Sequence, residues 1–249
     1  MINSCLTADK IKFKRRELKY VISEKVYAIL RQRLSAILMH DNGCSKDSNG
    51  YFIRSLYFDS IGDQALYEKL GGYDSRKKYR IRIYDLNDSR GKFEIKAKRG
   101  ELIHKSIFWL SKEEITKAQI RDYSWMKEKT EPHWKQFHHI FISQEMKPVV
   151  IIDYVRDAYM VPFNNLRITF DKDLAITPVD CLKGCSMYEK ILNPYKPMGE
   201  KVIMEIKFDG IMTPKYIKTL LSGIDAPRLA VSKYVIGRLC FSNQPWHAY

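Results

Sequence analysis

The sequence lacks any uninterrupted apolar run of about 18 residues, the length at which a transmembrane helix becomes a candidate. It also lacks the apolar core of a secretory signal near its first residues, so we expect neither a membrane span nor a leader. Cysteine is scarce: the five cysteines form an odd number and include no CxxC pair. This usage predicts free thiols rather than a disulfide framework, and with it a reducing, cytoplasmic setting.

Long linkers, internal repeats and low-complexity tracts are also missing, so we expect residues 1–249 to form one domain. Acidic residues are under-represented. The chain has 43 Lys and Arg against 29 Asp and Glu, a formal net charge of +14. Such an excess favours a polyanionic partner, which could be nucleic acid, an anionic membrane or a phosphate compound. Charge alone does not choose among these, but the placement of the charge does.

Eight segments have the composition and alternation of β-strands. They follow one another with few intervening helices, which favours antiparallel pairing over βαβ units. The predicted strands are 11–22, 51–59, 78–85, 92–100, 104–110, 147–161, 166–174 and 201–210.

Helices are predicted at four places between and after these strands. Ser23 can cap a helix from Glu24 to about residue 39, and Ser111 with Glu114 reads as a capping box. The segment 121–145 is expected to be helical, and Thr213-Pro214 marks the start of a further helix. The fold class is therefore α+β.

The strands share one design, which is clearest in "KYRIRIY" at residues 78–84. Tyr79, Ile81 and Ile83 project to one face, and three cations project to the other. The segments near residues 15–19, 92–98, 167–171 and 202–208 repeat this separation, with a few carboxylates among the cations. The simplest interpretation of any one such strand is a solvated charged face.

Repetition over five strands favours a more specific arrangement. We expect an antiparallel barrel of about eight strands whose interior carries the charge and whose apolar outer face is covered by helices. A cationic interior repels itself unless an anion fills it, and interior carboxylates could help to hold Mg²⁺ or Mn²⁺. No RNP motif, zinc knuckle or helix-turn-helix is legible, and a closed tunnel excludes a duplex, so we expect no nucleic-acid partner.

The sequence resembles the VTC domain, the polyphosphate polymerase branch of the triphosphate tunnel metalloenzymes (the CYTH-like superfamily). The similarity spans roughly residues 10–240 and rests on motifs in the family's order: "RRELKY", "SLYFD", "KYRIRIY", "FEIKAKRG", "RITFD", "VIMEIKFDG" and "LAVSKYVIG". The resemblance implies an antiparallel β-tunnel with a basic interior, a divalent metal, and ATP, triphosphate or polyphosphate as ligand.

The resemblance also implies roles for individual residues. Phosphate would be bound by Lys19, Arg80, Arg82, Lys96, Lys105, Arg156, Arg167 and Lys233. Arg82, Lys233 and Glu205 would be catalytic, with Glu205 as the principal metal ligand and Glu17 and Glu94 as further acidic ligands. One position departs from the wider superfamily, whose signature is Glu-x-Glu-x-Lys, because Arg15 stands where the first glutamate is expected. This departure fits the polymerase branch.

The implied reaction is transfer of the γ-phosphoryl group of ATP onto a polyphosphate chain. Two alternatives remain open at this point. One is a triphosphate hydrolase that uses the same tunnel with water as acceptor, and the other is a non-catalytic module that binds polyphosphate or triphosphate. Family members often act beside membrane proteins, so a membrane-protein partner is a further expectation.

Overall fold

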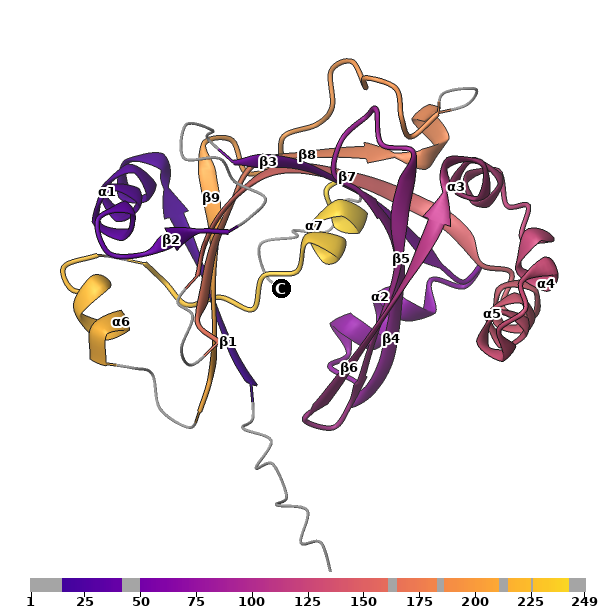
Figure 1. The fold of residues 1–249 in the computed structure, drawn as a ribbon, viewed down its shortest axis with the longest axis horizontal. Coiled ribbons are helices and arrows are strands. Elements are labelled where there is room, and N and C mark those ends of the chain that lie inside the picture. The colour runs from indigo at the N-terminus through magenta and orange to yellow at the C-terminus, as the bar shows by residue number, and fades with distance from the viewer. Residues whose placement is uncertain are drawn as a thin grey trace, which may run out of the picture.

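The computed structural model describes residues 15–41, 50–160, 165–182, 186–210, 215–224 and 226–241 (Figure 1). All eight predicted strands are present in it. They are β1 (Arg15–Ser23), β3 (Tyr51–Asp59), β4 (Ser75–Ile83), β5 (Arg90–Arg99), β6 (Leu102–Ser111), β7 (Lys147–Met160), β8 (Arg167–Pro178) and β9 (Lys201–Asp209). A short strand that was not predicted, β2 (Met39–His40), pairs with β7.

The strands form one antiparallel sheet in the order β1-β9-β8-β7-β3-β4-β5-β6. The sheet curves into an arch, as Figure 1 shows, with β1 and β6 at its two ends. Within the described residues these two strands form no ladder with each other, so the tunnel is open where the sequence predicted a closed barrel.

A segment near the C-terminus explains why β6 does not close onto β1. Tyr20 of β1 forms an antiparallel bridge with Arg228, and the Leu229 amide donates to the carbonyl of Lys19 at 3.0 Å. The residues around Arg228 therefore occupy the edge of β1 that a closing strand would need.

The helices after Ser23 and Ser111 begin where the sequence predicted them, although the first ends at Ser35 and not near residue 39. The Ser23 side chain accepts a hydrogen bond from the Val26 amide at the start of α1 (Glu24–Ser35). Ser111 and Glu114 form the predicted capping box of α3 (Lys112–Gln119). Helices α4 (Trp125–Glu128) and α5 (Pro132–Ser143) fall within the predicted 121–145 segment. The predicted cap at Thr213-Pro214 lies outside the described residues. The remaining helices are α2 (Gln64–Leu70), the 3-10 turn η1 (Val179–Leu182), α6 (Lys215–Leu220) and α7 (Lys233–Leu239).

The outer face of the sheet is apolar and carries two cores. One contains Ile81, Ile83 and Phe93, packed with residues of α3, α4 and α5. The other contains Ile168 and Ile206, packed with residues of α1 and α6. Ile81 and Ile83 are 1% and 0% exposed, so the outward half of the alternation in "KYRIRIY" packs under helices as predicted. The apolar side of this sheet is convex.

Two helices, α2 and α7, depart from the prediction that helices cover only the outside, since residues of both belong to a third core on the inner side of the sheet. Helix α7 lies within the arch (Figure 1), and its Tyr234, Val235 and Ile236 share this core with Ile152 of β7 and Ile176 of β8. The close approach is possible because position 237 is glycine: a Cβ there would lie 2.9 Å from the Ile152 side chain. In the described part of the chain, no helix has both the length and the apolar character needed to cross a membrane.

Candidate functional site

The inner face of β4, β5 and β6 presents side chains in rows, because paired residues on neighbouring antiparallel strands lie side by side. From one end of the wall to the other, the rows are Arg76–Lys98–Ile103, Lys78–Lys96–Lys105, Arg80–Glu94–Ile107 and Arg82–Lys92–Trp109. Successive rows are separated by about 7 Å, two residues along a strand. Eight of these twelve positions are Lys or Arg and one is acidic, so this wall is a cationic surface.

Glu94 is the charge centre of this wall. It is 2% exposed, and it contacts Arg80 at 2.6 Å, Lys105 at 2.7 Å and Arg82 at 3.7 Å. Burial alone would raise the pKa of Glu94, but Arg80, Arg82 and Lys105 outweigh burial and hold the pKa far below its ordinary value. One carboxylate thus stays ionised among three cations, and this set of four residues has a net positive charge.

Two tyrosines, Tyr57 of β3 and Tyr154 of β7, hold the arginines of β4 in place. Arg80 donates to the Tyr57 hydroxyl at 2.9 Å, and Arg82 donates to the Tyr154 hydroxyl at 2.9 Å and to Ser55 at 3.3 Å. Arg82 is only 6% exposed. Its guanidinium is therefore held in position by neutral oxygens before any ligand arrives, which suits a group that must meet an anion without rearranging.

The opposite wall, formed by β1, β9 and β8, carries a second network. Asp171 is 0% exposed, accepts two hydrogen bonds from Arg156 at 2.7 and 2.8 Å, and contacts Lys233 Nζ at 2.5 Å. Glu205 lies 3.4 Å from Lys19 Nζ, 2.7 Å from Lys207 Nζ and 3.8 Å from Lys233 Nζ. Lys233 thus links the two carboxylates from the first turn of α7.

The electrostatics of the second network favour the charged forms of Glu205, Asp171 and Lys233. Burial favours neutral Glu205, yet Lys233, Lys19 and Lys207 hold its pKa well below the ordinary value. In the same way Arg156 and Lys233 overcome burial and lower the pKa of Asp171 to about 2. Burial would lower the pKa of Lys233, but Asp171 and Glu205 raise it.

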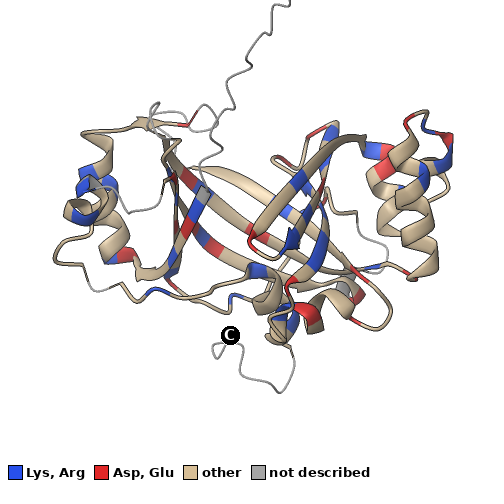
Figure 2. Ribbon diagram, turned by 90° about the horizontal axis from the view of Figure 1, so that it is seen from below, with Lys and Arg blue, Asp and Glu red and all other residues tan. Residues whose placement is uncertain are grey.

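The two walls meet through Glu17 and Lys96. Glu17 of β1 contacts Lys19 at 3.0 Å and reaches Lys96 of β5 at 3.9 Å. This ion pair spans the side of the tunnel on which no ladder joins the end strands. Figure 2 marks Lys and Arg in blue and Asp and Glu in red along the ribbon, and both recur on the strands of the arch.

A cavity of about 630 Å³ opens beside this contact. It is bounded by the inner face of β1, β4 and β5, by α2 and by the segment 228–232. Among the described residues, its charged lining is one carboxylate, Glu17, and seven basic side chains, Lys19, Lys69, Arg76, Lys78, Lys96, Lys98 and Arg228. A concave surface with this balance concentrates anions.

Lys78 shows how strongly this cavity disfavours further positive charge. Burial, together with Lys69, Lys19 and Arg76, lowers the pKa of Lys78 to about 7. Its Nζ donates to Ser232 at 3.3 Å and lies 4.8 Å from the centre of the Tyr234 ring. An anion in the cavity would restore the ordinary basicity of this lysine.

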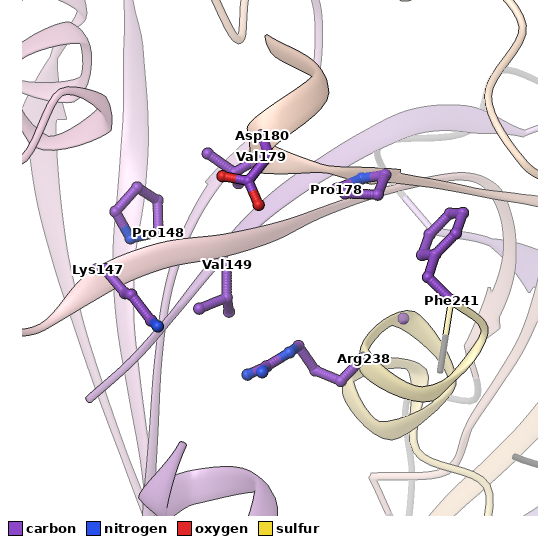
Figure 3. Close-up of a pocket in the computed structure, with 9 residues that line it drawn as sticks. Lys147, Pro148, Val149, Pro178, Val179, Asp180, Arg238 and Phe241 are labelled. Carbon is purple, nitrogen blue, oxygen red and sulfur yellow. The ribbon is translucent and has the colours of Figure 1, made fainter. Parts of the chain in front are cut away.

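A second cavity, of about 230 Å³, lies between the start of β7, the end of β8 and α7 (Figure 3). Arg238 lines it, but this arginine is already paired with Asp59 at 3.3 Å and Asp63 at 2.8 Å. The other described charged residues in the lining of this second cavity are Lys147 and Asp180, so it does not share the cationic character of the first cavity.

The structure brings most of the predicted site residues to the two walls. Lys19, Glu205, Lys233 and Arg156 belong to one network, and Arg80, Arg82, Glu94 and Lys105 belong to the other, with Lys96 and Glu17 between them. Arg167 stands apart. It is on the inner side of β8 but pairs with Asp41 and with the Tyr51 hydroxyl.

The three acidic residues predicted as metal ligands do not form one cluster. Glu17 and Glu205 share Lys19, whereas Glu94 is held by its own three cations. Among the described residues, no group of three or more His, Cys, Asp or Glu side chains is placed to hold a metal ion. Glu17 and Glu205 fit a hard cation that takes its remaining ligands from phosphate oxygens, as Mg²⁺ often does.

Sequence reasoning did not name several side chains of the site, among them Lys207 of the second network and Lys69 and Arg76 of the cavity. It also missed Asp171, Tyr57, Tyr154 and Ser55. Asp171 has the inward parity of its strand, so the alternation could have identified it. Alternation could not have identified the three side chains that hold the arginines. Nothing in the sequence shows that Ser55 and Tyr57 of β3, or Tyr154 of β7, lie beside Arg80 and Arg82.

Comparison with known proteins is in line with this geometry. The model of the VTC domain family matches residues 14–242. Among solved structures, a candidate adenylyl cyclase from Hippeastrum, described as having a dominant triphosphatase activity, superposes with a TM-score of 0.51 at 15% identity. The match covers 89% of this chain and 94% of that one.

A candidate adenylate cyclase from Bacillus halodurans gives a TM-score of 0.50 at 14% identity, over 88% of this chain and 93% of that one. At these identities the likeness concerns the fold. The comparison with curated proteins found no match. The family match covers nearly the whole chain, so the protein belongs to the VTC domain family and has the triphosphate tunnel fold.

Proposed function

We propose that this VTC-domain protein is a metal-dependent phosphotransferase that moves the γ-phosphoryl group of ATP onto the end of a polyphosphate chain inside the tunnel. The observation that carries the proposal is the cavity of about 630 Å³, in which seven cations accompany one carboxylate. A phosphate chain carries about one negative charge per repeating unit, and it could neutralise several of these cations together. The family match supports a polymer as ligand in preference to triphosphate alone.

The reaction joins two anions, so the protein's main task is to neutralise and align them. An oxygen of the terminal phosphate attacks the γ-phosphorus of ATP, the bond to the β,γ-bridging oxygen breaks, and ADP leaves. The terminal phosphate is already ionised near neutral pH, so no general base is required. Arg80 and Arg82 would hold the transferring group, because Tyr57 and Tyr154 fix both guanidinium groups in advance.

Lys19 and Lys233 would act from the opposite wall. Both are pinned to Glu205, at 3.4 and 3.8 Å. A bound Mn²⁺ or Mg²⁺ would be held by Glu205 and Glu17 with phosphate oxygens, and it would neutralise charge on the phosphates. Lys19 now bridges these two carboxylates, so occupation of that place by a cation would leave the lysine available to phosphate.

A hydrolase is the second candidate. Glu17 is a partly exposed carboxylate beside Lys19 and at the edge of the cavity, where it could orient an attacking water. Of the structures with the same fold, the Hippeastrum protein is described as a triphosphatase. Non-catalytic binding of polyphosphate would use the same cations. We further propose that the protein works in a reducing, cytoplasmic setting and beside a membrane-protein partner.

The decisive experiment is incubation of the purified chain with ATP and Mn²⁺, followed by separate measurement of free phosphate and of chain polymer. Polymer with a matching release of ADP supports the phosphotransferase. Phosphate without polymer would replace it by the hydrolase, and retention of polyphosphate without either product would leave only a binding module. Arg82→Ala is the matched negative control, because Arg82 belongs to the inner face and to neither of the outer cores.

A further inference from the structure

A cluster of aromatic rings and cations lies at the other end of the β4–β5–β6 wall from the Arg76 row. Trp109 of β6 has the guanidinium carbon of Arg90 4.4 Å from its ring centre and Lys92 Nζ at 4.9 Å. Lys92 Nζ also lies 4.7 Å from the centre of the Tyr84 ring, and Tyr84 packs beside Tyr51 at 6.1 Å between ring centres. Among the described residues that line the cationic cavity, by contrast, none is aromatic.

Trp109 is the most unusual member of this cluster. Its side chain is 51% exposed, although it belongs to the inner face of the sheet. The other described tryptophans, Trp125 and Trp134, are each 3% exposed in the outer core. A large ring left half in water on the concave side of a curved sheet has apolar area that a planar ligand could cover.

The register connects this ring directly to the buried arginine. Arg82, Lys92 and Trp109 are successive partners across β4, β5 and β6. Trp109 therefore lies two strand spacings, about 10 Å, from Arg82, with a lysine between them. The row therefore presents an aromatic ring, then a cation, then a fixed arginine. A nucleoside triphosphate has matching groups in the same order: its base, its first phosphates and its last phosphate.

We infer that Trp109 is the stacking platform for the base of the donor nucleotide, and that Lys92 contacts the phosphates between the base and Arg82. The inference rests on the proposed function and deepens it, since it names how one end of the tunnel recognises the donor. Arg90 is exposed and can leave the ring when a base stacks there. Stacking uses the π face that all bases share, so the platform accepts purine nucleotides with little discrimination.

The inference also assigns directions within the tunnel. The donor enters at the Trp109 end, and the growing chain occupies the cation-lined cavity, whose described lining residues include no aromatic side chain. The rival explanation of the exposed ring is that β6, which pairs only with β5 in the described sheet, docks onto a second copy of the chain through Trp109, Ile107 and Ile103.

The test compares two ligands on two variants of the full chain. Trp109→Ala should weaken binding of ATP about 5- to 150-fold, the range for loss of one base–aromatic stack. It should leave binding of inorganic triphosphate within about twofold, because triphosphate has no base. Trp109→Phe should restore most of the ATP affinity, and GTP should follow ATP in all three proteins. Circular dichroism of each variant shows whether the fold is retained.

Several outcomes would overturn the inference. Equal losses for ATP and triphosphate would make Trp109 a structural residue, and unchanged ATP affinity would remove it from the site. Conversion of a dimeric parent to a monomer by Trp109→Ala, measured by light scattering with ATP affinity intact, would establish the rival. If the parent binds triphosphate but does not bind ATP more tightly, the inference about Trp109 is wrong and the proposed function still stands. If the parent binds neither ligand, the proposed function fails with it.

Discussion

Replacing Glu94 with glutamine tests whether the cationic inner face is suited to binding an anion. Glu94 is 2% exposed and is the single acidic member of the β4–β5–β6 wall, with Arg80 at 2.6 Å and Lys105 at 2.7 Å. Glutamine keeps the size of the side chain and some of its hydrogen bonds, so the substitution removes little besides the charge. The ligand-free variant then holds three neighbouring cations without their carboxylate.

Breaking a buried ion pair by removing one partner typically costs about 3–5 kcal/mol. The effect should be smaller here, because water can reach the side chains of Arg80 and Lys105, which are 24% and 40% exposed. We therefore expect a loss of about 2–3 kcal/mol. For a chain of this length, that corresponds to a melting temperature lower by about 4–12 °C.

Triphosphate should reverse this loss. In the parent, triphosphate at about 100 times its Kd stabilises the fold by about 2.7 kcal/mol. In Glu94→Gln the ligand also replaces the missing negative charge, so the stabilisation at the same concentration should be larger and the Kd lower. The assay is thermal unfolding of both proteins with and without millimolar triphosphate, at low and at moderate ionic strength.

Glu17→Gln is the matched control. Glu17 is 25% exposed, and its partner Lys19 keeps Glu205 as a second carboxylate, so the expected loss is below about 1 kcal/mol. The reasoning is refuted if Glu94→Gln melts with the parent. It is also refuted if triphosphate raises the melting temperature of parent and variant by the same amount.

Further predictions concern Arg82, Lys78, the divalent metal and the domain organisation. Arg82→Ala should weaken triphosphate binding tenfold to a hundredfold in a titration, whereas Ile81→Ala, at the outward position beside it, should cost about 2–5 kcal/mol of stability and leave the Kd unchanged. The pKa of Lys78 is lowered to about 7 from 10.5, so the unfolded chain binds more protons between these values; chemical denaturation should show the ligand-free stability rising across this window. Triphosphate binding near pH 8 should take up a proton, seen by calorimetry in buffers of different ionisation enthalpy, and Lys78→Met should abolish that uptake. Chelation of divalent metal should stop polymer formation while triphosphate binding persists. If residues 1–249 form one domain, they should unfold in one cooperative transition, and two separated transitions would argue against a single domain.

Alternation along each strand was enough to predict which residues share a face of the sheet. The period of two puts Arg80 and Arg82 on one side of β4 and Ile81 and Ile83 on the other, and the structure separates them in this way. The helix caps at Ser23 and Ser111 were likewise predictable, because a capping side chain bonds an amide only three residues away. Local geometry decides each of these features, so the local sequence contains it.

Partners across strands were beyond the sequence. Glu94 and Arg80 share a row only because β4 and β5 pair in one register, and Asp171 meets Lys233 only because α7 folds into the arch. The sequence predicted that Glu205, Glu17 and Glu94 would all serve as metal ligands. The structure separates them, because Glu94 is paired with cations of one wall and Glu205 with cations of the other.

The sequence by itself determined an α+β chain whose strands each have an apolar face and a cationic face. The tertiary structure decided that the cationic faces curve toward one another and that the arch stays open, because the residues around Arg228 occupy the edge of β1. It also decided which cations gather around one cavity and thereby lower the pKa of Lys78. The physical reason is range: alternation and caps act over a few residues, whereas ion pairs and burial depend on segments that only the folded sheet brings together.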